Sequence, residues 1–251
     1  DPLKNRQEAK MLVSNQGRFV HDKVGNFTDY LTKDDLLVFN NTKVIPCRLK
    51  AKKYKNINKD SFLDIEVTLN KAETGEIWSS FCLPGRKVKV GDTLHFETDF
   101  FAKVVEISHG LYFLKFNKTR ISLIKLLERI GLMPIPPYII KERGFKESDF
   151  KNYQATFAKY IGSVAAPTAS LHFDKNLFNK IRKKKVPFCF VTLHVSGATF
   201  IPVKSKKLSD HKMHSEFAKV DSEATSKIKD TLHNGGRVIA VGTTVMRVLE
   251  S

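Results

Sequence analysis

The sequence predicts a mixed α/β body interrupted by an inserted β-barrel, and three observations support this fold class. Buried strands with polar ends and amphipathic helices occur before residue 48 and after residue 119. Between them lie short alternating segments separated by turn residues, which are typical of an antiparallel barrel or sandwich. The 251 residues, with 41% hydrophobic and 27% charged side chains, suffice for two folded parts. We therefore expect a discontinuous α/β domain of residues 1–47 and 120–251, with a barrel domain of residues 48–119.

Each element follows from its local pattern. Residues 35–40 form an apolar strand that ends in Asn40, Asn41 and Thr42. The barrel strands are expected at residues 62–69, 77–83, 93–96, 101–107 and 111–116, separated by turn residues such as Gly75, Gly85, Gly91 and Gly110.

The second half of the chain alternates helices and strands. A helix over residues 121–130 stops at Gly131, and a proline-rich extended stretch follows at residues 134–139. We then expect helices at residues 173–185 and 216–233, strands at 188–195 and 238–241, and a last helix after Gly242-Thr243-Thr244.

The charge of the chain favours a polyanionic partner. Its formal net charge is +17, from 10 Arg, 33 Lys and 26 acidic residues. A host with AT-rich DNA would also enrich lysine, so charge alone leaves both explanations open. The three cysteines have no metal or redox spacing, which favours a reducing, cytoplasmic setting, and no apolar run approaches the length of a membrane span.

Two stretches pair a Leu-His with small and hydroxylated residues, namely residues 162–173 and 191–200. Small residues let a ligand approach the backbone, and hydroxyls and imidazoles hold polar ligands, so the stretches predict two walls of one pocket. His172 and His194 lie in these walls, and His214 and Glu216 precede a predicted helix. A lone histidine is more often structural, but several beside Thr, Ser or Glu favour a proton-transfer site.

The turn Gly242-Thr243-Thr244 lies between a strand and a helix start, where anionic ligands gather in α/β sheets. Its hydroxyls could bind a carboxylate or a ribose, or one of them could simply cap the helix. Arg247, one turn further, would face the same side if the helix starts at Thr243, or it could equally be a solvated helix residue. No zinc spacing, Walker loop or glycine-rich dinucleotide loop occurs, so we expect no metal.

Several long stretches together resemble the QueA family, the S-adenosylmethionine:tRNA ribosyltransferase-isomerases of queuosine biosynthesis. They occur in the family's order along essentially the whole chain. The similar stretches are residues 35–49, 84–86, 135–139, 162–173, 191–203, 213–216 and 236–244.

The resemblance implies an α/β domain with an inserted six-stranded barrel. It also implies transfer of the ribosyl part of S-adenosylmethionine to 7-aminomethyl-7-deazaguanine in a tRNA anticodon. Isomerisation then gives epoxyqueuosine, with release of adenine and methionine. The expected partners are this tRNA and S-adenosylmethionine, which serves as co-substrate. We expect no membrane association, a cytoplasmic location and a monomer.

Within the similar stretches, and at Arg247 just after the last of them, we assign candidate roles. The proton-transfer candidates are His172, His194, His214 and Glu216. The substrate-binding candidates are Thr168, Ser170, Thr199, Gly242, Thr243, Thr244, Arg247 and Asn41.

The chain departs from the family pattern at three places. Ser170 replaces a usual Gly, Ser196-Gly197-Ala198 replaces Gly-Ala-Gly, and Asn41 replaces Asp. The family also extends beyond both ends of this sequence, so we expect a shortened chain. Two alternatives therefore remain: a decayed homologue that binds tRNA without catalysis, and an ordinary methyltransferase, which the missing glycine-rich loop disfavours.

Overall fold

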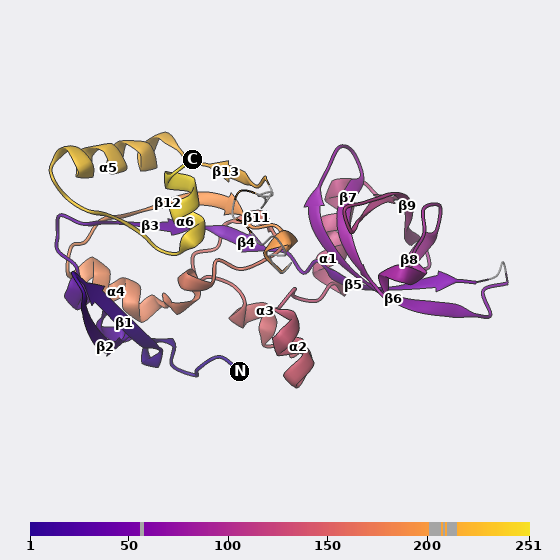
Figure 1. Ribbon diagram of the computed structural model, residues 1–251, viewed down its shortest axis with the longest axis horizontal. Helices are drawn as coiled ribbons and strands as arrows, with labels where there is room; N and C mark the ends of the chain where they lie inside the picture. Colours follow the sequence, from indigo (N-terminus) through magenta and orange to yellow (C-terminus); the bar gives the residue numbers. More distant parts are fainter. Residues whose placement is uncertain (56–57, 201–206, 208, 210–214) are drawn as a thin grey trace. The chain divides into compact units, whose positions relative to one another are not determined.

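The chain divides into two compact units in the computed structural model, which describes residues 1–55, 58–200, 207, 209 and 215–251 (Figure 1). Unit 1 comprises Asp1–Lys43, Lys151–Val195 and Glu216–Ser251, and unit 2 comprises Val44–Phe150 and Ser196–Ser215. Unit 2 therefore contains the barrel strands and also three segments that the sequence analysis assigned to the α/β domain. These segments are residues 44–47, 120–150 and 196–215. The domain boundaries at residues 47/48 and 119/120 stay a prediction.

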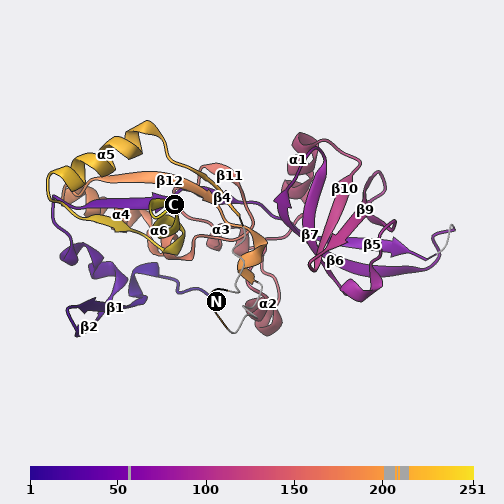
Figure 2. The same ribbon diagram turned by 45° about the horizontal axis from the view of Figure 1, so that its top comes forward.

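A four-stranded sheet forms the centre of unit 1, in the order β13-β12-β3-β14 (Figure 2). Its strands are β3 (Leu36–Asn40), β12 (Phe188–His194), β13 (Phe217–Lys219) and β14 (Val238–Ala240). β12 and β14 run parallel to β3, and β13 runs antiparallel to β12. The carboxyl ends of three parallel strands therefore meet at one edge, where α/β proteins bind ligands.

Alternate residues of the sheet face opposite layers of helix, as the period of a strand requires. Leu36 and Val38 pack with residues of α5 (Ser222–His233) and α6 (Thr243–Leu249). Leu37 and Phe39 pack in an aromatic cluster with α4 (Lys175–Lys183). Burial on both faces explains why β3 is continuously apolar.

Helices α4 and α5 of unit 1 begin at side-chain caps. The carboxylate of Asp174 accepts a hydrogen bond from the N–H of Leu177, and that of Asp221 accepts one from Ala224. Among the described residues no helix is both long and apolar enough to cross a membrane.

The remaining short elements lie along the chain between these larger ones. They are η1 (Arg6–Glu8), η2 (Val24–Tyr30), β4 (Thr42–Val44), η3 (Gly85–Lys87), α2 (Pro137–Arg143), α3 (Asp149–Asn152), β11 (Tyr160–Ser163), η4 (Thr168–His172) and η5 (Gly197–Phe200).

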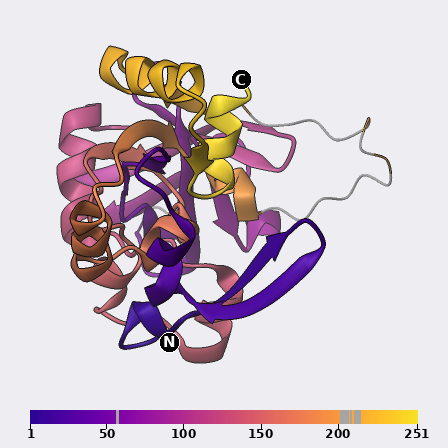
Figure 3. The ribbon, with the colours of Figure 1, turned by 90° about the vertical axis from the view of Figure 1, so that its left-hand side faces the viewer.

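Two local predictions were wrong, and one hairpin was not predicted. Residues 217–219 form β13 rather than the start of a helix, because α5 begins only after its cap Asp221. The proline-rich stretch turns into α2 at Pro137, a residue type that suits the first turn of a helix. An unpredicted hairpin, β1 (Lys10–Asn15) with β2 (Arg18–Lys23), forms a separate two-stranded ribbon (Figure 3).

Unit 2 contains a closed six-stranded antiparallel barrel, in the order β10-β7-β6-β5-β8-β9. This confirms the predicted fold class, a mixed α/β body with a six-stranded barrel. The strands are β5 (Arg48–Tyr54), β6 (Phe62–Ala72), β7 (Ile77–Leu83), β8 (Thr93–Glu97), β9 (Phe100–Ser108) and β10 (Leu111–Phe116).

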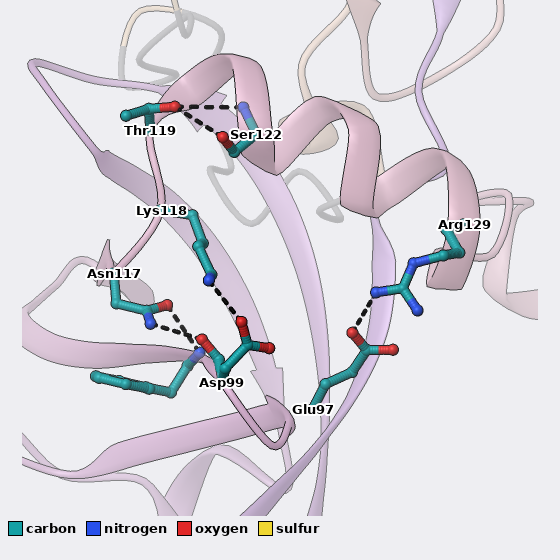
Figure 4. Close-up of polar contacts among 8 residues, drawn as sticks. Glu97, Asp99, Asn117, Lys118, Thr119, Ser122 and Arg129 are labelled. Atoms are coloured by element: carbon teal, nitrogen blue, oxygen red, sulfur yellow. Dashed lines mark hydrogen bonds and ion pairs between the residues drawn. The ribbon is translucent and has the colours of Figure 1, made fainter.

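Helix α1 (Arg120–Ile130) packs on this barrel within unit 2 (Figure 4). Its apolar face buries Leu123 and Leu127, and Arg129 forms an ion pair with Glu97 of β8. Just before the helix, Lys118 pairs with Asp99 at 2.8 Å. Exposed ion pairs contribute little, so the buried leucines supply most of the attachment.

Candidate functional site

At the carboxyl edge of the sheet in unit 1, the buried side-chain amide of Asn40 makes four hydrogen bonds. Its Oδ1 accepts hydrogen bonds from the N–H groups of Thr42 and Leu193, both at 3.1 Å. Its Nδ2 donates to the carbonyl of Leu193 at 3.0 Å and to Oγ1 of Thr244 at 3.3 Å. Asn40 therefore connects the ends of β3 and β12 to the start of α6, which fixes the spacing of the candidate groups.

His194, the last residue of β12, is the best-positioned histidine at this edge. Its Nδ1 lies 2.8 Å from Oγ1 of the buried Thr42. Its ring stacks on Phe217 of β13, with centroids 5.5 Å apart and an angle of 20° between the planes. These contacts fix the orientation of the imidazole, which a proton-transfer group requires.

Because Gly162 has no side chain, the imidazole of His194 can lie directly against its backbone. A Cβ built on Gly162 would lie 2.8 Å from both Cδ2 and Nε2 of His194. The neighbouring Ser163 hydroxyl donates to the carbonyl of Ala165 at 2.8 Å and accepts the N–H of Val195 at 2.9 Å. The two stretches predicted as walls of one pocket therefore lie directly against each other.

The turn before α6 approaches η4 closely. Gly242 has φ +94° and occupies the N-cap position, so neither Thr243 nor Thr244 is the helix cap. A Cβ on Gly242 would lie 3.0 Å from Cβ of Ala169 in η4. Thr243 is exposed, and Thr244 holds the hydrogen bond to Asn40.

Glu216 and Arg247 form an ion pair in unit 1. The Glu216 side chain is 7% exposed and that of Arg247 is 35% exposed. The pair joins the residue before β13, next to the ring that stacks on His194, to the first turns of α6. Because the Glu216 carboxylate is already paired with the Arg247 guanidinium, this geometry favours a positioning role for Glu216.

Three further candidates lie on η4. Thr168 is exposed, whereas Ser170 is fully buried, and its hydroxyl has no hydrogen-bond partner among the described residues. His172 is exposed, yet the surrounding protein atoms lower its pKa, and the positive charge of Arg6 lowers the pKa further. The imidazole of His172 is therefore favoured in its neutral form, which can accept a proton.

The remaining candidates are Asn41, Thr199 and His214. Asn41 is buried and accepts a hydrogen bond from Oγ1 of Thr192 at 2.7 Å, which joins β3 to β12. Thr199 is an exposed residue of η5 in unit 2. His214 lies outside the described residues.

Sequence reasoning missed four residues of the site: Asn40, Thr42, Gly162 and Ser163. Asn40 and Thr42 had a usable signal, because both are polar residues directly after an apolar strand. Gly162 and Ser163 begin a motif already singled out, but only the structure shows which neighbours they contact.

The described residues contain no group of three or more His, Cys, Asp and Glu that could hold a metal. The three cysteines are buried, and burial raises the pKa of Cys82 to about 12 and that of Cys189 to about 11. Such thiols stay protonated at neutral pH and are poor nucleophiles.

A groove of about 380 Å³ lies elsewhere in unit 1. Its lining includes Phe178 and Arg182 of α4 and Phe188 and Phe190 of β12. Because these β12 residues come from the first half of the strand, the groove is not part of the carboxyl edge that holds His194.

The sequence matches known proteins along its whole length. The profile of the family described as queuosine biosynthesis protein matches residues 1–251. The chain is 40% identical over 251 residues to an S-adenosylmethionine:tRNA ribosyltransferase-isomerase of Ruegeria sp. (strain TM1040). It is 38% identical over 256 residues to the protein of the same name from Rickettsia bellii (strain OSU 85-389). Each match covers 100% of this chain and 72% of the relative.

A solved structure is also similar, that of S-adenosylmethionine tRNA ribosyltransferase from Thermotoga maritima. It shares 29% sequence identity, with a TM-score of 0.42, over 100% of this chain and 67% of that chain. The full-length family match, and relatives at about 40% identity, show that this chain belongs to the queuosine biosynthesis protein family.

Proposed function

We propose that this protein is an S-adenosylmethionine:tRNA ribosyltransferase-isomerase. It transfers the ribosyl part of S-adenosylmethionine to 7-aminomethyl-7-deazaguanine in a tRNA anticodon and isomerises it to epoxyqueuosine, releasing adenine and methionine. The family membership supports this reaction class, and the names of the relatives supply S-adenosylmethionine and tRNA as its substrates. We place the activity in the cytoplasm, in a monomer without a metal.

The observation that carries the proposal is the fixed imidazole of His194 at the carboxyl edge of the sheet. The reaction requires a base that removes a proton from the carbon next to the sulfonium. It also requires an acid that protonates adenine as its bond to the ribose breaks. We propose His194 as one of these two groups, because Thr42 and Phe217 fix its ring. His172, with its lowered pKa, is the candidate for the other role, and His214 remains a candidate too.

The same edge supplies groups that could orient the substrate. Thr243 and Thr244 begin α6, and Arg247 is held one turn further by Glu216. We propose that Arg247 binds the carboxylate of the methionine part, since a guanidinium suits a carboxylate. Glu216 then acts as a positioning residue, and the threonine hydroxyls, with Thr168, contact the ribose.

The test is to incubate the protein with S-adenosylmethionine and tRNA that carries the precursor base, then analyse the tRNA nucleosides by mass. The proposal predicts epoxyqueuosine in the tRNA and adenine in solution. His194→Ala should lower the rate of adenine release by roughly 10²- to 10⁴-fold, the usual contribution of an acid–base group. The matched control is His233→Ala, a change in an exposed histidine at the end of α5.

Other outcomes would contradict the proposal. Binding of tRNA with no adenine release would indicate a homologue that lacks catalysis, and formation of S-adenosylhomocysteine would indicate a methyltransferase. Near-normal turnover in alanine variants of all three histidines and of Glu216 would reject the site assignment while leaving the reaction intact.

A further inference from the structure

Four aromatic rings form a continuous row on the outside of the barrel in unit 2. The row crosses four strands that are hydrogen-bonded neighbours, in the order β6, β5, β8 and β9. One ring comes from each strand: Phe62, Tyr54, His95 and Phe101, respectively. Consecutive ring centroids are 6.2 Å, 5.1 Å and 5.7 Å apart. The register explains the row, because Tyr54 lies opposite Phe62 and His95 lies opposite Phe101.

The alternation of each strand turns these rings outward. On β9, Phe100 and Ala102 are fully buried in the barrel, whereas the intervening Phe101 is 37% exposed. On β6, Phe62 is 42% exposed and Ile65 is buried. The rings of this aromatic row are therefore additional to the barrel core.

Lysine side chains accompany the aromatic row. The ammonium of Lys52 lies 4.2 Å from the ring centroid of Phe62, and that of Lys59 lies 5.4 Å from the centroid of Tyr54. Lys103 follows Phe101 by two residues on β9, so both face outward. Acidic groups on the same strands include Asp64, opposite Lys52, and Glu97, which is paired with Arg129.

Cross-strand stabilisation is too small to explain this arrangement by itself. An aromatic cross-strand pair contributes about 0.2–1 kcal/mol, and smaller β-branched residues would serve a strand as well. Instead, four neighbouring rings with partly exposed faces and flanking cations combine the two features with which proteins hold unpaired nucleotides. Bases stack on the rings, and lysines attract the phosphates.

We propose that the aromatic row is a stacking platform for unpaired nucleotides of the tRNA substrate, with Lys52 and Lys103 near the phosphates. The identity of this RNA rests on the proposed function. The net charge of +17 is consistent with a polyanionic occupant. Stacking tolerates any base, so the platform contributes affinity and leaves recognition of the precursor base to other residues.

The experiment compares Phe101→Ala with Val105→Ala. Both residues are on β9, both face outward, and both are 37% exposed, but only Phe101 belongs to the aromatic row. Binding is measured by fluorescence anisotropy with a tRNA transcript and with a single-stranded oligouridylate of about ten nucleotides. We expect Phe101→Ala to weaken both complexes roughly 5- to 100-fold, and Val105→Ala to leave them unchanged.

Two further measurements separate stacking from charge and from misfolding. Lys103→Gln should reduce the slope of log affinity against log salt by about 1, whereas Phe101→Ala should leave that slope unchanged. Ultraviolet crosslinking of oligouridylate to the unaltered protein should map to peptides of β5, β6, β8 or β9, and this test needs no variant. Equal RNA affinity in both β9 variants, or crosslinks that map only to unit 1, would overturn the proposal.

The reaction and the platform can fail separately. If the unaltered protein makes epoxyqueuosine and Phe101→Ala leaves the KM for tRNA unchanged, the platform is rejected and the function stands. If no product forms but Phe101→Ala still weakens RNA binding, the reaction is rejected and the platform stands.

Discussion

Gly162 controls the position of the imidazole of His194, because its missing side chain is the space that the ring fills. Gly162→Ala should push the ring away from its contacts with Thr42 and Phe217. A displacement of about 1 Å in a catalytic group can lower kcat by roughly 10²-fold, and we expect that loss in adenine release. Thr42→Val, which removes the hydroxyl at Nδ1, should act in the same direction, and Thr42→Ser should retain activity. Normal kcat in Gly162→Ala would show that the position of this ring does not matter.

Ser170 carries a buried hydroxyl that has no partner among the described residues. Ser170→Ala should therefore raise the free energy of unfolding by about 1 kcal/mol, because the desolvation penalty of the hydroxyl disappears. The matched control is Ser163→Ala, since Ser163 is equally buried but bonds Ala165 and Val195, and its loss should destabilise the protein. Thermal unfolding of both variants measures the difference. If Ser170→Ala instead destabilised the protein, the inference that this hydroxyl makes no stabilising hydrogen bond would be wrong.

Arg6 influences the protonation of His172. Desolvation by the surrounding protein atoms, followed by the charge of Arg6, lowers the pKa of the solvent-exposed His172 below 6.5, so the neutral imidazole persists to lower pH. If His172 is the base, the acid limb of kcat/KM against pH lies below 6.5. Arg6→Gln should then move this limb upward, because the repelling charge is gone. Arg6→Lys keeps the charge and should leave the limb in place; an equal shift in both variants would reject electrostatic control.

At the scale of elements, Asp35 and Arg237 join the starts of β3 and β14. Asp35 is buried and bonds Nε and Nη2 of Arg237 at 2.7 and 2.8 Å, and these contacts lower its pKa below 3.8. Because Arg237 is 61% exposed, we expect Asp35→Asn to lower the free energy of unfolding at pH 7 by only about 1–2 kcal/mol.

The pH dependence of this effect has a defined sign. A carboxylate with a lowered folded-state pKa stabilises above its unfolded pKa, and the stabilisation is lost as pH falls through the folded value. The difference between Asp35→Asn and the unaltered protein should therefore shrink below pH ~3.8 in denaturant titrations. Glu223→Gln, in the exposed pair with Lys227, should change stability by less than about 0.5 kcal/mol. If the free energy of unfolding of Asp35→Asn were lower by the same amount at every pH, the stabilisation could not come from the ion pair with Arg237.

Elements with regular periodicity and clear flanking turn residues could be predicted from the sequence. Strands that depend on hydrogen bonding to partner strands could not. β7 and β10 have the predicted bounds, because their flanking turn residues define them. β5 was missed, since its alternation of Leu49 and Ala51 with lysines resembles a solvated segment until its partners β6 and β8 are known. β13 was mistaken for helix although Asp221, a strong helix cap, lies just after it.

The same distinction applies to the site. The motifs identified His194 and the turn at Gly242 from local chemistry. The contact of Asn40 with Thr244, 204 positions apart in the sequence, depends on the sheet order and could not be predicted locally. The pairing of Glu216 with Arg247 likewise required the structure to bring β13 and α6 together.

At the scale of the whole molecule, the excess of 43 basic over 26 acidic residues predicts a salt-dependent association with tRNA. Each phosphate that a lysine or arginine neutralises releases counterions, so several contacts should lower affinity at least about tenfold between 50 and 200 mM salt. S-adenosylmethionine is the control ligand, because it carries few charges and its affinity should change little over the same range. Titrations of both ligands at several salt concentrations give the two slopes. A flat slope for tRNA would mean that the lysine excess reflects composition rather than a phosphate-binding surface.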